Sequence, residues 1–178
     1  MITHKTRQSR KNGPWVPIPS ILFPFIILFI HGLPALSQPT QSGDEAELWR
    51  LRDKAEEAMS VGDPQTAALN SGKAALMASL LAKQNSRPAF HEVYQSLEAI
   101  LRAQENVYRA IALYHQSGDH IPVSSGVCRT LALALSQQKQ AKTLLPPALP
   151  QDPMFQQLPM ELQEWKETIE ELSSEFGC

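Results

Sequence analysis

The feature that most constrains this fold is the spacing of apolar residues from Leu48 to Phe176, which recur every three or four positions between Gly and Pro breaks. This spacing places apolar side chains on one side of an α-helix, whereas a half-buried strand would alternate them at every second residue. Such alternation is hard to find in the chain. We therefore predict an all-α fold, a small bundle of about five helices.

Local start and stop signals place these helices. The first is predicted to begin at Ser42, where Ser-Gly-Asp-Glu has the spacing of a capping box, and to end at Gly62. Asp63-Pro64 then starts a second helix, with Asp63 as the N-cap and Pro64 in the first turn. Further helices are predicted over 86–116 and 124–145, and Pro159 opens the last one.

Residues 38–145 are predicted to form a helical-hairpin domain, followed by a Pro-rich connector over 146–157 and a C-terminal helix over 158–178. The connector is expected to be poorly helical, because proline lacks an N–H donor and disfavours helix in the residue before it.

Three predicted helices have distinctive faces. The third carries a single apolar stripe, and the last carries another that we expect to dock on its own domain, with its glutamates forming a solvated face. The second is rich in small side chains, which allow a neighbouring helix to approach closely. The small residues are Ala67, Ala68, Ser71, Ala74, Ala75 and Ala78. The C-terminal stripe is Leu162, Trp165, Ile169, Leu172 and Phe176, and the glutamates are Glu161, Glu164, Glu167, Glu170, Glu171 and Glu175.

Residues 1–37 have the order of regions found in a secretory signal peptide. A basic stretch precedes the apolar run 21–30, and Ala35 and Ser37 provide small residues for cleavage before Gln38. The competing interpretation is an uncleaved anchor, because residues 15–36 are just long enough to cross roughly 30 Å of hydrocarbon. In both cases the domain that follows is expected outside the cytoplasm, in the periplasm, the cell envelope or the extracellular space.

The charge distribution argues against nucleic acid as a partner. Residues 1–37 hold four Lys/Arg and no Asp or Glu, and the other 141 residues hold 12 basic and 18 acidic residues, a net charge of −6. Nucleic-acid binding depends on basic side chains that neutralise phosphates, and a mildly acidic domain is poorly suited to it. Contact with a membrane is expected only through residues 15–36, if that segment stays attached.

The two cysteines, Cys128 and Cys178, allow one disulfide in an oxidising compartment but do not require it. We expect Cys128 to be a small buried apolar residue and Cys178 a free thiol at the chain end, with a disulfide between them as the alternative.

The stretch from Leu51 to Ala75 resembles a tetratricopeptide repeat, a helix-turn-helix unit in which small residues let two helices pack. A weaker echo follows around Gly118-Asp119. The resemblance implies stacked helical hairpins that bind a peptide or another protein, without catalysis; an ordinary bundle of close-packed hairpins would explain the same residues. The matching positions are Leu51, Ala55, Ala58, Gly62, Ala67 and Ala74.

No strong catalytic, cofactor or metal motif occurs. His115, Asp119 and His120 are close in sequence, but a metal site would need a further ligand, so we interpret them as solvated turn residues. Ser124-Ser125-Gly126 lacks the context of a nucleophile elbow and is interpreted as a helix start. An enzyme is therefore not expected.

These patterns favour a non-enzymatic protein-interaction or scaffold module, with a concave binding face formed by residues 51–75 and 107–135. The alternative is a small-ligand or lipid carrier with an aromatic-lined pocket between helices, although aromatic residues more often fill a core. The aromatic candidates are Phe90, Tyr94, Tyr108, Tyr114, Trp165 and Phe176.

Overall fold

The computed structural model describes residues 43–118 and 126–178, and all regular structure in these ranges is helical. The chain divides into two units, 1–37 and 38–178, and the described residues belong to the second. The all-α prediction is confirmed. The predicted signal or anchor segment and the expected helix start at Ser42 lie outside the described residues. The helices are α1 (Gly43–Ser60), α2 (Pro64–Gln84), α3 (Pro88–Gln116), α4 (Val127–Leu144), α5 (Pro153–Gln156) and α6 (Leu158–Glu175).

The turn between α1 and α2 has the chemistry expected from the sequence. Gly62 follows α1 with a φ of 79°, a left-handed conformation that glycine adopts without a steric penalty. Asp63 is the N-cap of α2, and its side chain accepts a hydrogen bond of 3.0 Å from the Thr66 backbone N–H. Local signals therefore place this turn.

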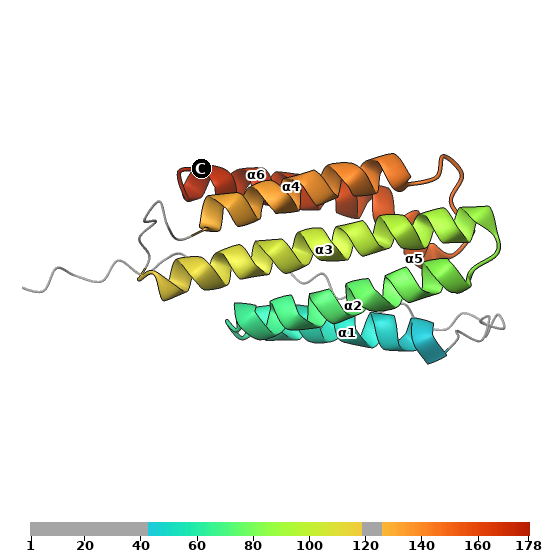
Figure 1. Cartoon of the computed structure of the whole chain (residues 1–178), viewed down its shortest axis with the longest axis horizontal. Helices are drawn as coiled ribbons and strands as arrows, with labels where there is room; N and C mark the ends of the chain where they lie inside the picture. The colour runs from blue at the N-terminus through green and yellow to red at the C-terminus, as the bar shows by residue number, and fades with distance from the viewer. Residues whose placement is uncertain (1–42, 119–125) are drawn as a thin grey trace, which may run out of the picture. The chain divides into compact units, whose positions relative to one another are not determined.

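Helices α2, α3 and α4 lie side by side, with α1 packed on α2 and α6 packed on α4 and α3 (Figure 1). The small side chains predicted on α2 are all buried, which lets α2 approach its neighbours closely. The C-terminal helix docks on its own domain, with Ile169 fully buried and Phe176 packed beside Leu131 and Val127.

The prediction of a single apolar stripe on α3 is incomplete, because more than one side of this helix is buried. From Ala103 to Tyr108, six consecutive residues are buried, because α3 is contacted by α2, α4 and α6 from different sides. A helix surrounded in this way buries polar as well as apolar positions, and a repeat of apolar residues along the sequence cannot reveal them.

The Pro-rich connector also differs from the prediction, because it includes the one-turn helix α5. Pro153 occupies the first turn, where its missing N–H costs nothing, and the side chain of Asp152 accepts a 2.9 Å hydrogen bond from the Met154 N–H. This turn places Phe155 in the core, where Phe90 and Tyr94 meet it edge to face. The connector is therefore a packed part of the domain.

The two cysteines form a disulfide, so the expectation of two free thiols is wrong and the alternative holds. Cys128, in the first turn of α4, is joined to Cys178, with a Cα–Cα distance of 5.3 Å. They meet because the α6 stripe docks against α4 and brings the end of the chain, through the buried Phe176, to the start of that helix.

We expect the disulfide to be a major contributor to stability, because it closes a loop of 50 residues in the unfolded chain. Cys178→Ser should lower the free energy of unfolding by about 4 kcal/mol, the value that loop-closure entropy gives for a loop of this size. Urea unfolding followed by circular dichroism measures this loss.

Two controls accompany that measurement. Cys128→Ser should give the same loss, and a reductant should destabilise the native chain but leave Cys178→Ser unchanged. Equal stability of the native chain with and without reductant would contradict the prediction.

Candidate binding groove across α2, α3 and α4

Three consecutive polar side chains are buried at the middle of α3: Gln104, Glu105 and Asn106. Successive residues of a helix point about 100° apart, so these three side chains reach three different neighbours. Each one hydrogen-bonds or pairs with a partner, as buried polar groups must to offset the loss of water. This polar cluster positions the surface described below.

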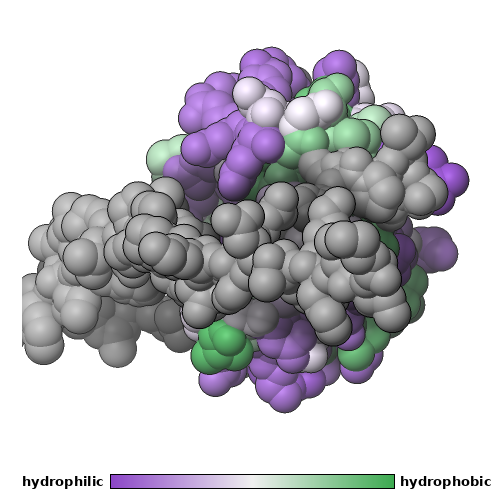
Figure 2. Space-filling view, turned by 90° about the vertical axis from the view of Figure 1, so that its left-hand side faces the viewer, coloured by the Kyte–Doolittle hydropathy of each residue, from purple (hydrophilic) through white to green (hydrophobic). Residues whose placement is uncertain are grey.

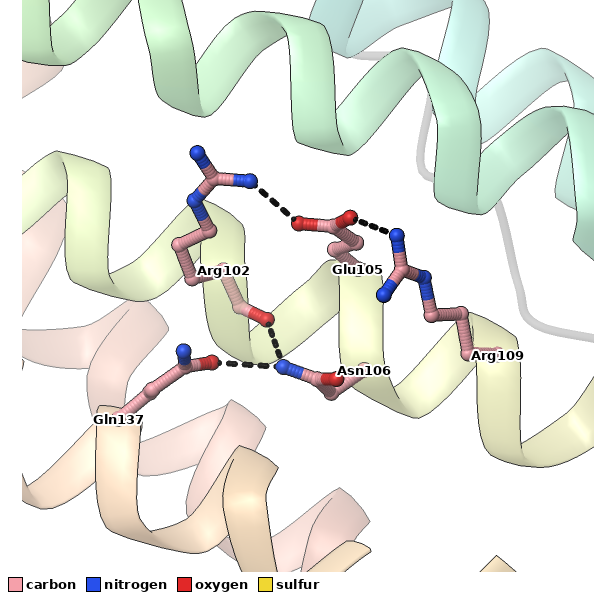
Figure 3. Close-up of polar contacts among 5 residues, drawn as sticks. All are labelled: Arg102, Glu105, Asn106, Arg109 and Gln137. Atoms are coloured by element: carbon pink, nitrogen blue, oxygen red, sulfur yellow. Dashed lines mark hydrogen bonds and ion pairs between the residues drawn. The ribbon is translucent and has the colours of Figure 1, made fainter. Parts of the chain in front are cut away.

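Glu105 faces α2 and is held between two arginines of its own helix (Figure 3). Its oxygens pair with Arg102 at 2.8 Å and with Arg109 at 2.5 Å. The position opposite on α2 is Gly72, where an added Cβ would lie 2.9 Å from Oε1 of Glu105. The missing side chain of Gly72 therefore makes room for the buried carboxylate.

Asn106 faces α4. Its side-chain Nδ2 donates to the backbone oxygen of Arg102 at 2.9 Å and to Oε1 of Gln137 at 2.8 Å (Figure 3). The second bond crosses from α3 to α4, and it fixes the spacing of the two helices at this level.

Gln104 faces the side of α3 opposite to Asn106, where it contacts Glu161 of α6, which in turn pairs with Arg52 of α1. Oε1 of Glu161 accepts a 3.1 Å hydrogen bond from Nε2 of Gln104 and lies 2.9 Å from the Arg52 guanidinium. Glu161 was predicted on the solvated face of its helix, and that prediction is wrong, because the residue is buried where Gln104 of α3 and Arg52 of α1 contact its carboxylate. Burial raises the pKa of Glu161 above 4.5, and the pull of Arg52 in the opposite direction does not cancel the effect.

On the side of α3 away from Glu161, the surface is hollowed into a groove of about 650 Å³ between α2 and α4. Leu69 on α2 and Leu133 on α4 line it, and these residues are 57% and 51% exposed. At the helix ends on the left of Figure 1, apolar residues reach the surface beside hydrophilic ones (Figure 2). The groove is lined by Gln65, Ala68, Leu69, Asn106, Arg109, Ala112, Leu113, Gln116, Arg129, Thr130 and Leu133.

The groove lining is suited to binding. Its described residues include no Asp, Glu, His, Cys, Lys or Tyr, the side chains that most often transfer protons or act as nucleophiles. It offers apolar contacts, side-chain amides and two guanidinium groups. The face predicted from residues 51–75 and 107–135 overlaps it only in part, because no residue of α1 lines it.

The positions that resemble a tetratricopeptide repeat lie at the contact between α1 and α2. All except the turn residue Gly62 are buried, and three of them, Ala55, Ala58 and Ala67, belong to one apolar cluster with Val107 and Tyr108 of α3. Any pair of closely packed helices would bury residues of this kind, and the repeat stays a prediction.

The aromatic candidates pack against other aromatic side chains. Tyr108 meets Trp165 edge to face, and Tyr114 stacks on Phe176 at 4.3 Å between ring centroids. Burial raises the pKa of Tyr108 to about 12. Phe90 and Tyr94 contact Phe155, and they also line a separate surface hollow of about 560 Å³ near α5.

The histidine candidates are only partly described. His115 is exposed near the end of α3, while Asp119, His120 and the Ser124-Ser125 pair lie outside the described residues. In the ranges 43–118 and 126–178, no three His, Cys, Asp or Glu side chains converge in a way that could hold a metal ion. The same ranges contain no helix with the length and apolar character needed to cross a membrane.

Comparison with known proteins gives no relative: no family model, no curated protein and no solved structure matches this chain. The groove and the chemistry of the residues around it are the features of this chain that bear on its function.

The contact between Gly72 and Glu105 predicts that Gly72→Ala changes the free energy of unfolding in opposite directions in two backgrounds, with and without the Glu105 carboxylate. Gly72→Ala should lower the free energy of unfolding by about 1–2 kcal/mol, because the new methyl group displaces a carboxylate held by two arginines. In a Glu105→Ala background the same change should stabilise by about 0.8–1 kcal/mol, the difference in helix propensity between the two residues. Urea unfolding of the four chains measures both effects, and equal effects of Gly72→Ala in the two backgrounds would contradict the contact.

The raised pKa of Glu161 predicts a pH dependence of stability. The folded state holds this proton more tightly than the unfolded state, so the contribution of Glu161 is largest below pH 4.5 and declines as the pH rises through the folded-state pKa. Glu161→Gln cannot titrate there. The native chain should therefore lose stability relative to the Glu161→Gln variant as the pH rises through the folded-state pKa of Glu161. Above that pH the difference in unfolding free energy between the two chains should stay constant. Urea unfolding at a series of pH values tests this, with Glu164→Gln, an exposed change on the same helix, as the control.

Proposed function

We propose that this chain is a non-enzymatic protein-interaction module that works outside the cytoplasm and binds its partner in the groove across α2, α3 and α4. The observation that carries the proposal is the pair of exposed leucines on opposite walls, Leu69 and Leu133. Fully burying an exposed leucine side chain contributes about 1.5–3 kcal/mol. Because Leu69 and Leu133 are each about half exposed, covering both with apolar side chains of a partner contributes about that amount in total.

The polar lining supports a peptide or protein as the occupant. Gln65 and Gln116 are exposed side-chain amides at the groove, and each can donate to and accept from the backbone of a bound chain. An apolar centre with polar groups around it is the usual composition of a protein interface.

A location outside the cytoplasm is supported by two independent features. The order of basic, apolar and small residues in 1–37 is that of a secretory signal. The disulfide between Cys128 and Cys178 is a bond that persists in oxidising compartments and is rare in the cytoplasm. The periplasm, the cell envelope and the extracellular space all satisfy both.

The alternative function, a carrier of a small ligand or lipid, has less support. Carrier sites bury most of a ligand between apolar and aromatic side chains. The groove across α2, α3 and α4 has no aromatic residue in its described lining, and the aromatic candidates are packed against other aromatic side chains.

Photo-crosslinking in the native host tests the proposal. A photoreactive amino acid at position 133 should capture a partner in the envelope or secreted fraction. Leu69→Glu on the opposite wall should reduce that capture about tenfold, since a loss of about 1.4 kcal/mol has this effect. The same amino acid at position 160 on α6, where Met160 is 62% exposed, is the matched control.

Two outcomes would contradict the proposal. Equal capture from positions 133 and 160, or capture that Leu69→Glu leaves unchanged, would mean that the groove is not the binding site. The intact mass of the recovered chain tests its location separately: a chain that retains residues 1–37 in a cytosolic fraction would exclude export.

A further inference from the structure

The helices that form the walls of the groove carry no acidic residues. Neither Pro64–Gln84 nor Val127–Leu144 contains Asp or Glu. This is unusual for a domain whose net charge is −6 after residue 37. Their charged residues are Lys73, Lys83, Arg129, Lys139 and Lys142.

The acidic residues are concentrated on α1 and α6 instead. Each of these helices has six Asp/Glu, against three basic residues on α1 and one on α6. Helix α1 packs on α2, and α6 packs on α4, so the charges are separated between the groove walls and the helices that cover the other side of α3.

The central helix keeps the groove positive. The Glu105 carboxylate is nearly buried, with its side chain 8% exposed, whereas Arg109, which pairs with it, is 58% exposed and lines the groove. The negative charge is therefore covered by α2 while the guanidinium group faces the solvent.

The apolar part of this surface extends beyond the groove. Leu69, Leu76 and Leu80 are all exposed and lie at spacings of seven and four, so they form one line along α2 with Lys73 between them. At a rise of 1.5 Å per residue, this line is about 16 Å long, or three helical turns.

A second, smaller hollow continues the surface between α3 and α4. Its volume is about 340 Å³, and Arg102 and Gln137 line it, the latter joined to Asn106 of the first groove. Glu98 is the one carboxylate among the described residues that line either hollow.

We propose, building on the protein-interaction function above, that the partner segment is an acidic amphipathic helix. Its apolar side chains cover Leu69 and Leu133, and its carboxylates lie near Lys73, Arg109 and Arg129. A helix satisfies its own backbone hydrogen bonds and presents side chains over several turns, which matches a surface formed by helices that lie side by side. An anionic bilayer also attracts exposed leucines and cations, but its acyl chains offer no hydrogen-bond partner to the side-chain amides of Gln65 and Gln116 in the groove.

Two synthetic helical peptides test this partner chemistry. They share one leucine pattern and differ only in having Glu or Lys at the remaining positions, and fluorescence anisotropy measures their binding to the purified full-length chain. The Glu peptide should bind at least about tenfold more tightly than the Lys peptide, and the preference should weaken with salt. Equal binding of the two peptides would overturn the proposal.

Charge-reversed variants connect the preference to this surface. Lys73→Glu with Arg129→Glu should reverse the preference toward the Lys peptide. Lys54→Glu with Lys166→Glu, on α1 and α6, is the matched control and should leave it unchanged. A preference that survives the first pair would overturn the proposal.

The membrane alternative has its own measurement, co-sedimentation with phosphatidylcholine vesicles with or without phosphatidylglycerol. If the variant with Lys73→Glu and Arg129→Glu no longer binds anionic vesicles but still binds the Glu peptide, the surface recognises lipid and the proposal is wrong. If position 133 captures a partner while neither peptide is preferred, the interaction function stands and only the acidic helix is rejected.

Discussion

The close approach of α2 to α3 is the contact on which the rest of the structure depends. It requires a stretch of small residues on α2, and it requires one position with no side chain, Gly72, above a buried carboxylate. Because Glu105 is covered there, Arg102 and Arg109 are held along the exposed side of α3 by a charge that solvent hardly reaches. The same contact therefore sets how closely α2 and α3 pack and where the exposed positive charges of α3 lie.

The boundaries of the helices could be predicted from sequence because the signals for them are local. Asp63-Pro64 and Pro88 each begin a helix, and Pro159 is in the first turn of α6, since an N-cap carboxylate or a proline in the first turn acts through its own backbone neighbours. The prediction of a poorly helical connector over 146–157 was incomplete. Proline disfavours helix in the residue before it but is well placed in a first turn, so Pro153 begins a helical turn that places Phe155 in the core.

The polar residues of the site could not be predicted in the same way. Glu161 and Glu164 look alike in sequence, and only the position of Arg52 and Gln104 in three dimensions separates the buried one from the exposed one. One signal was present: Gly72 lies inside a helix rich in alanine, where glycine costs about 1 kcal/mol unless a neighbour needs the space. The run Gln104-Glu105-Asn106 in the middle of an apolar helix is a second signal.

The disulfide has a mechanical consequence. Because Cys128 is in the first turn of α4 and Cys178 follows α6, the segment from α4 to the end of the chain is a covalently closed ring. A pulling force applied at the C-terminus passes through the bridge to the start of α4, and it does not peel α6 away turn by turn. A protease cut between the two cysteines leaves both fragments attached. The end of the C-terminal helix can therefore leave the domain only together with the start of α4.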